Sequence, residues 1–140
     1  MYKLLLAILL FCITPFVHAQ TQEPSLDLDT IYTMVDVMPA YPNGDAGWQA
    51  YLKKNLKFPK FARKSAVESE VVLELIVRKD GSITNIKYLT MAGYGFEEEA
   101  VRLLKQCEKW SPALKNGKPV NYKGRITIPF KLRLFRNDKD

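Results

Sequence analysis

Residues 120–134, with the sequence VNYKGRITIPFKLRL, alternate between apolar and polar side chains. This period of two is typical of a half-buried strand. One face carries apolar side chains, at Val120, Tyr122, Ile126, Ile128, Phe130, Leu132 and Leu134. The other face carries polar and cationic side chains, at Asn121, Lys123, Arg125, Thr127, Lys131 and Arg133. The segment therefore predicts a long strand with one buried face and one basic face.

Pro129 lies inside this predicted strand. Proline has no N–H to donate to a neighbouring strand, so we expect at least one side of the strand to be free of a partner. An open edge of this kind can receive a strand from another chain by backbone pairing. The same residues, proline with lysine and arginine, are also typical of an ordinary edge strand that is protected from aggregation. The pattern leaves both interpretations open.

The chain before this strand predicts helices and a hairpin. Apolar residues recur at helical spacing from Trp48 to Leu56, after a capping residue at Asp45, and residues 60–66 can form a short second helix. The hairpin and the longest helix are predicted at residues 70–79, 82–91 and 96–109, with Asp80-Gly81 at the turn and a bulge between Ile83 and Ile86. We therefore expect an α+β domain in which two helices pack on a small three-stranded, mainly antiparallel sheet.

The N-terminus has the pattern of a secretory signal peptide. Lys3 precedes an apolar run at residues 4–16, and Ala19 ends a sequence that predicts cleavage before Gln20. The run is shorter than the roughly 20 residues that a membrane-spanning helix needs, although a retained membrane anchor is the alternative. We predict a signal peptide at 1–19, a flexible acidic arm at 20–37, one domain at 38–135 and a tail at 136–140.

The side chains that could carry chemistry are few. Cleavage would remove Cys12 and His18, which leaves Cys107 as the one cysteine and no histidine for a metal site or a catalytic triad. Cys107 lies on the apolar stripe of a predicted helix, and residues 97–99 are glutamates at its N-terminus, where the helix dipole favours acids. No phosphate loop, zinc spacing or nucleophile–base pair is present. We predict a binding module without enzymatic activity, cofactor or metal.

Charge is unevenly distributed along the chain, whose formal net charge is +6. Residues 20–45 contain acidic residues and no basic one, so the rest of the chain carries the positive excess. A basic domain suits nucleic acid, anionic lipid or acidic proteins. The predicted export argues against nucleic acid and leaves acidic proteins and the anionic envelope as partners.

An ordered set of motifs resembles the TonB C-terminal domain family. The matching elements are MPAYPNG at 38–44, Phe58-Pro59 with Ala62-Arg63, KDGSI at 79–83, Glu99-Ala100, Trp110 with Pro112, NGKPV at 116–120 and IPF at 128–130. The likeness covers about residues 38–134. Ser69 and Asn43 each stand where the family usually has glycine.

The resemblance implies a function in the periplasm. Family members transmit energy from the ExbB–ExbD motor of the inner membrane to TonB-dependent receptors of the outer membrane. Their C-terminal domain takes the receptor's short N-terminal segment, the Ton box, as an added strand beside the last long strand. Carried to this chain, the receiving edge would comprise Tyr122, Lys123, Gly124, Arg125, Ile126, Thr127 and Ile128, flanked by Asn55, Lys57 and Phe58.

The N-terminal part of this sequence differs from that of a full family member in a way that bears on mechanism. A full transducer has an uncleaved membrane helix and a long proline-rich spacer, whereas this sequence begins with a short segment that predicts cleavage and has no proline-rich run before residue 38. A cleaved product would bind Ton boxes without attachment to the motor, whereas a retained N-terminus would make a short, membrane-anchored transducer. An open edge can also pair with its own copy as a dimer. The alternative from another class is a structural envelope protein that binds peptidoglycan or anionic lipid through its basic face.

Overall fold

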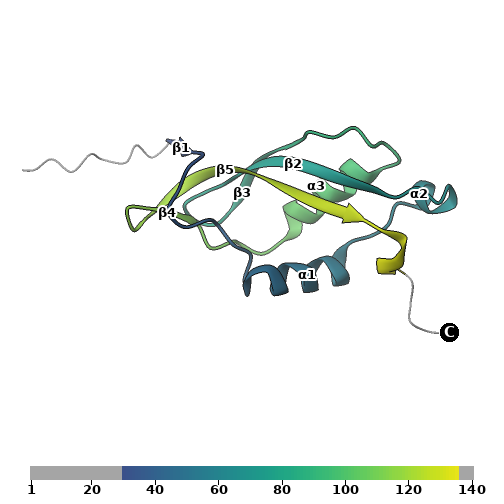
Figure 1. The fold of residues 1–140 in the computed structure, drawn as a ribbon, viewed down its shortest axis with the longest axis horizontal. Coiled ribbons are helices and arrows are strands. Elements are labelled where there is room, and N and C mark those ends of the chain that lie inside the picture. The colour runs from purple at the N-terminus through teal and green to yellow at the C-terminus, as the bar shows by residue number, and fades with distance from the viewer. Residues whose placement is uncertain (1–29, 136–140) are drawn as a thin grey trace, which may run out of the picture.

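The computed structural model describes residues 30–135 (Figure 1). The elements are β1 (Ile31–Tyr32), α1 (Gly44–Asn55), α2 (Lys60–Lys64), β2 (Ser69–Val77), β3 (Ile83–Tyr88), α3 (Phe96–Gln106), β4 (Ala113–Lys115), β5 (Lys118–Phe130) and the 3-10 turn η1 (Leu132–Phe135). The predicted signal peptide, residues 20–29 of the predicted arm and residues 136–140 lie outside the described residues. The α+β class is confirmed.

The sheet is larger than the sequence predicts. The main path has the order β1-β5-β2-β3, and β4 also pairs with β5. The prediction of a three-stranded sheet is wrong, because β4 forms a hairpin with β5 and β1 pairs with it in parallel at residues 121 and 122. Two- and three-residue strands are too short to show a period of two, so their pairing arises from the tertiary fold.

The described end of the predicted arm contacts the domain. Besides β1, Val37 pairs with Leu114 of β4, and the Lys115 ammonium lies 5.3 Å from the centre of the Tyr32 ring. The position at which the arm ends and the domain begins stays a prediction.

Helices α1 and α3 share one face of the sheet, which we call the helix face. Buried residues of both helices form one core with the buried side chains of β2 and β5, at Trp48, Leu52, Ala100, Leu103, Leu104, Val71, Leu73, Leu75, Ile128 and Phe130. Val71, Leu73, Leu75 and Val77 of β2 point toward this core at every second position, as strand geometry requires, and Ile76 on the other face is also buried. Two hydrogen bonds join the helices, from Tyr51 Oη to Leu103 O (2.9 Å) and from Arg102 Nη2 to Asn55 O (2.8 Å).

Several boundaries differ from the predicted ones. Helix α1 begins at Gly44, so Asp45 lies in its first turn and does not cap it. Helix α3 ends at Gln106 because Cys107 is extended, and β5 ends at Phe130, after which the Leu132 N–H donates to Glu68 Oε1 at 2.6 Å. The predicted bulge is confirmed, because the register shifts between the pairs Glu74–Lys87 and Ile76–Thr84.

The Asp80-Gly81 turn joins β2 and β3 as predicted. Asp80 Oδ1 accepts hydrogen bonds from Ser82 Oγ (2.6 Å) and Ser82 N (3.0 Å), and Lys109 Nζ donates to Asp80 Oδ2 at 3.0 Å. These contacts, led by those from Ser82, hold the pKa of Asp80 well below its usual range.

This turn predicts a pH-dependent stability. Because the folded-state pKa of Asp80 is depressed, its contribution is present above the unfolded-state pKa of about 3.9 and is lost as pH falls from there through the folded-state pKa. We expect Asp80→Asn to be less stable than the wild type at neutral pH and to converge with it in strong acid. Free energies of unfolding from urea titrations at several pH values test this, and parallel curves for the two proteins would contradict it.

Candidate functional site

Strand β5 has two edges, and the hydrogen bonds of β2 identify which one is covered. The Val72 N–H donates to Thr90 Oγ1 at 3.1 Å, and Val72 O accepts from the Leu89 N–H at 2.8 Å. Both backbone groups of Val72 therefore point toward β3. Backbone groups alternate in direction along an antiparallel pair, so those of Leu73 and Leu75 point toward β5.

The other edge of β5 carries the alternate residues. Leu73 and Leu75 lie opposite Ile126 and Gly124, whose backbone groups point back to β2. The backbone groups of Lys123, Arg125 and Thr127 therefore point away from β2. Pro129 shares this direction, so its missing N–H removes no bond to β2.

We call the backbone of residues 123–129 on this side the open edge. Strand β1 covers the residues just before it, at 121 and 122. Beyond Tyr122, none of the strands within residues 30–135 pairs with this side of β5. In Figure 1, β5 runs across the molecule with β1 near its start and α1 alongside.

The sheet face opposite the helices is charged near the open edge. Lys123 Nζ lies 3.0 Å from Glu74 Oε1, and Lys131 Nζ lies 3.6 Å from Glu70 Oε1. The Arg125 side chain is exposed and forms no ion pair with any residue in the range 30–135. Arg125 is therefore the cation of this edge that is best placed to meet an incoming carboxylate.

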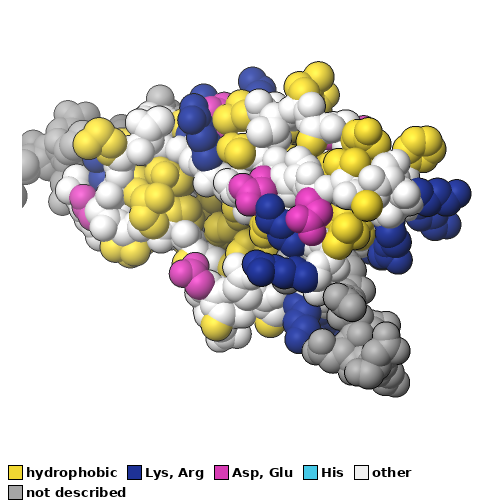
Figure 2. Space-filling model, turned by 45° about the vertical axis from the view of Figure 1, so that its right-hand side comes forward, with side chains coloured by type: hydrophobic (Ala, Val, Ile, Leu, Met, Phe, Trp, Pro, Cys, Tyr) yellow, Lys and Arg dark blue, Asp and Glu magenta, His cyan; other side chains and the backbone are white. Residues whose placement is uncertain are grey.

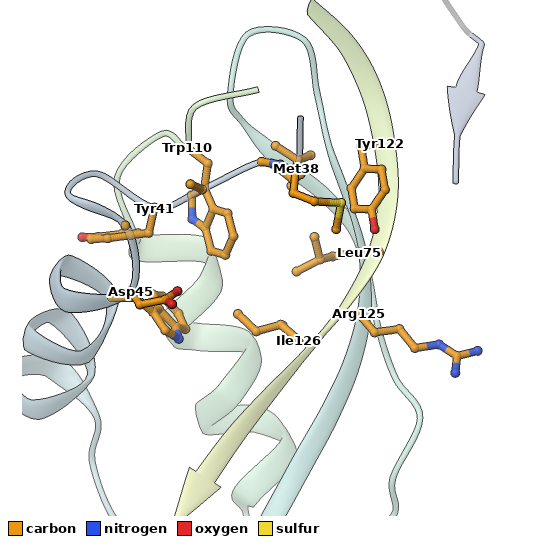
Figure 3. Close-up of a pocket in the computed structure, with 14 residues that line it drawn as sticks. Met38, Tyr41, Asp45, Leu75, Trp110, Tyr122, Arg125 and Ile126 are labelled. Atoms are coloured by element: carbon orange, nitrogen blue, oxygen red, sulfur yellow. The ribbon is translucent and has the colours of Figure 1, made fainter. Parts of the chain in front are cut away.

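A hollow of about 260 Å³ lies on the helix face beside the open edge. We call it the aromatic pocket. Its lining comes from residues 38–41, α1, β2, β5 and Trp110, and includes Met38, Tyr41, Trp48, Leu75, Trp110, Tyr122, Gly124 and Ile126. Figure 2 shows hydrophobic side chains gathered around a hollow on this side of the molecule. In Figure 3, Trp110, Tyr41 and Asp45 lie on one side of β5, and the Arg125 side chain points to the other.

Aromatic side chains hold one wall of this pocket in place. The rings of Trp48 and Trp110 meet edge to face at 5.6 Å between centroids, and Tyr41 lies 5.4 Å from Trp48. Such pairs add to the stabilisation that burial supplies. Burial raises the pKa of Tyr41 and of Tyr51, so both phenols stay neutral.

Two glycines permit this arrangement. Gly81 has a φ of +83°, and a Cβ at this position would lie 2.0 Å from the Trp110 carbonyl oxygen, so only glycine lets the Trp110 backbone approach. The Trp110 N–H donates to Gly81 O at 2.9 Å. At Gly124, a Cβ would lie 2.4 Å from the Tyr122 ring, so the ring occupies space that glycine leaves empty.

The structure divides the residues of the predicted receiving edge into three groups. Lys123, Arg125 and Thr127 present their backbone on the open edge. Tyr122, Gly124 and Ile126 line the pocket, to which Arg125 also contributes. The Ile128 side chain is fully buried in the core.

The three predicted flanking residues are engaged elsewhere. Phe58 is buried and packs against Phe96 with 5.6 Å between ring centroids. The Lys57 N–H donates to Glu99 Oε1 at 2.7 Å, and Asn55 Nδ2 donates to Tyr51 O at 2.9 Å. A binding role for these residues and for the receiving edge stays a prediction.

Sequence reasoning missed the aromatic pocket. The sequence identifies Trp48 by its helical spacing and Trp110 as part of a family motif. The available signal was that these are the only two tryptophans of the chain. Nothing in the sequence places them against one strand.

The residues that the sequence offers for catalysis or metal binding have structural roles. Burial raises the pKa of the Cys107 thiol, which therefore stays protonated. Glu97 is buried and accepts hydrogen bonds from the N–H groups of Ala92 and Gly93, and Glu99 pairs with Arg102. Between residues 30 and 135, no group of acidic, histidine or cysteine side chains could hold a metal ion.

A family model described as Gram-negative bacterial TonB protein C-terminal matches residues 54–132, more than half of the chain. The chain belongs to the TonB C-terminal domain family. The match runs from the end of α1 to the turn after β5 and includes the open edge. A search of curated proteins gives no match.

Membership of the TonB C-terminal domain family defines the general role. The family is non-enzymatic and periplasmic, and its domains bind TonB-dependent receptors and serve energy transduction to the outer membrane. Within the part of this chain that the structure describes, no helix is long and apolar enough to cross a membrane.

Proposed function

We propose that this TonB C-terminal domain binds the Ton box of a TonB-dependent receptor as an added strand on the open edge of β5. The observation that carries the proposal is the row of outward backbone groups at Lys123, Arg125 and Thr127. A strand placed there would exchange backbone hydrogen bonds with these residues, which supplies affinity without requiring a particular sequence.

Charge supports an acidic segment as the ligand. Side chains of an added strand alternate between the two sheet faces. Those on the face away from the helices would lie beside Arg125, which has no anionic partner within residues 30–135. An acidic Ton box would supply one and would be steered to the edge by the basic domain.

The role in transport depends on the N-terminus. If residues 1–19 are removed on export, the domain acts in the periplasm without attachment to the ExbB–ExbD motor. It then competes with or assists a full transducer as a regulator. If they are retained, the chain is a short, membrane-anchored transducer. Both roles use the same open edge.

The test is an NMR titration of the isotope-labelled chain. The ligands are synthetic N-terminal peptides of TonB-dependent receptors from the same cell. We expect amide shifts concentrated at residues 123–127. Absence of shifts at millimolar peptide would reject the receptor role.

Salt separates this function from adhesion to the envelope. Strand pairing should largely survive about 0.3 M salt, at which the Debye length falls well below 10 Å. Binding that disappears at this ionic strength would instead indicate the basic surface and favour peptidoglycan or anionic lipid as the ligand.

A further inference from the structure

We propose that the aromatic pocket receives one large apolar side chain, such as phenylalanine or leucine, from the strand added to β5. The inference rests on the proposed function and assigns to the same site a second determinant besides backbone pairing. It identifies the partner as an extended peptide with an apolar residue at one fixed position.

The pocket lies beside the open edge, on the helix face of the sheet. Side chains of an added strand that point to the helix face lie level with those of Tyr122, Gly124 and Ile126. All three of these residues line the pocket. Gly124 has no side chain, and the Tyr122 ring occupies the space above it, so the pocket extends from this ring toward α1. A peptide residue opposite Gly124 would therefore direct its side chain between β5 and α1.

The volume of the pocket matches one side chain. Pockets for small-molecule ligands usually enclose about 300–1,000 Å³. This pocket has about 260 Å³, which suits a single large side chain. Residues of β5 beside the open edge line this pocket, so a side chain of a peptide paired there is the occupant that the fold presents to it.

The lining of the pocket is mainly apolar. The floor contains Leu75, Val77 and Ile126, and the wall contains Trp48 and Trp110. Asp45 and Arg125 are the charged residues of the lining, and both are exposed. Burying an apolar side chain against such a surface is favourable, whereas burying a charge without a partner is costly.

The two faces of the sheet together define a sequence pattern for the bound peptide. The residue that enters the pocket lies on the helix face, so its immediate neighbours in the peptide lie on the other face, near Arg125. An apolar residue flanked by acidic ones therefore fits both the pocket and the charge. This alternation distinguishes a matching Ton box from an acidic segment that lacks the apolar residue.

The test uses a series of synthetic receptor N-terminal peptides in which each position in turn is alanine, leucine or phenylalanine. Binding is measured by tryptophan fluorescence and by the NMR signals of the indole N–H groups. Because Trp48 and Trp110 both line the pocket and are the only tryptophans, these signals report its occupancy. At one position, we expect phenylalanine to bind about tenfold or more tighter than alanine and to shift both indole signals.

Two matched variants locate the effect. Ala40 lines the pocket, so Ala40→Leu should fill part of it and remove most of the preference for phenylalanine. Ala50→Leu makes the same change at an exposed position of α1 outside the pocket and should leave the preference intact. If Ala40→Leu does not fold, Met38→Ala is the second variant. It enlarges the pocket and should shift the preference from phenylalanine to tryptophan.

The possible outcomes separate the two proposals. Amide shifts at residues 123–127 with equal affinity for all peptides and unmoved indole signals would overturn the pocket and leave strand addition standing. An equal loss of preference in Ala40→Leu and Ala50→Leu would also overturn the pocket. Absence of any shift on the open edge would reject strand addition, and the pocket proposal would fall with it.

Discussion

Arg125→Pro is expected to weaken binding of an acidic Ton box peptide roughly tenfold to a hundredfold. The substitution removes an N–H that points outward on the open edge, and the peptide carbonyl that it would have met loses its donor, at a cost of about 1–3 kcal/mol. The fold should survive, because this N–H makes no bond to β2. Pro129 already occupies an equivalent position on the same edge. Isothermal titration calorimetry measures the affinity, and thermal unfolding measures the fold.

Two control substitutions separate the backbone effect from others. Arg125→Ala removes the charge and keeps the N–H, so it should weaken binding less than Arg125→Pro and reduce its salt dependence. Ile126→Pro removes an N–H that faces β2, so it should lower the melting temperature. Unchanged peptide affinity in a folded Arg125→Pro protein would show that the open edge is not the binding site.

Trp110→Ala is expected to lower the free energy of unfolding by about 3 kcal/mol, the low end for a truncated tryptophan because the side chain is half-buried. The indole packs against Trp48 and Tyr41, and its nitrogen is buried. Removing it would leave a cavity between α1 and the turn at Gly81. Urea denaturation followed by circular dichroism measures the change.

The matched control for this truncation is Tyr88→Ala. Tyr88 is an aromatic residue of β3 that is 52% exposed, so its removal should change stability far less. A melting temperature of Trp110→Ala equal to that of the wild type would mean that the aromatic wall does not stabilise the fold. The pocket would then lack the rigid side that the peptide proposal needs.

Local patterns predicted much of this fold. The alternation in β5 and the bulge after Ile83 depend on neighbours in the chain, and so does the Asp80-Gly81 turn. The interpretation of Cys107 and of residues 97–99 as structural also came from helical position alone. The order of the motifs was specific enough to predict the family.

Other features depended on pairing between distant segments. Strand β1 has two residues and pairs with residues 121 and 122, so no local period could reveal it. Phe58 was predicted to flank the edge, yet its ring is in the core beside Phe96. The family motif locates Phe58 in the sequence next to the edge, but packing against the core determines where its side chain points.

The sequence by itself determined that β5 is a long, half-buried strand with a proline-marked open side, because alternation and the missing N–H of Pro129 are properties of neighbouring residues. Only the tertiary structure decided which side is open, since this depends on the register between β2 and β5. It also decided that Trp48 and Trp110 meet beside Gly124 to form a pocket. Residues so far apart in the chain are brought together by the burial of a common core, which no local pattern encodes.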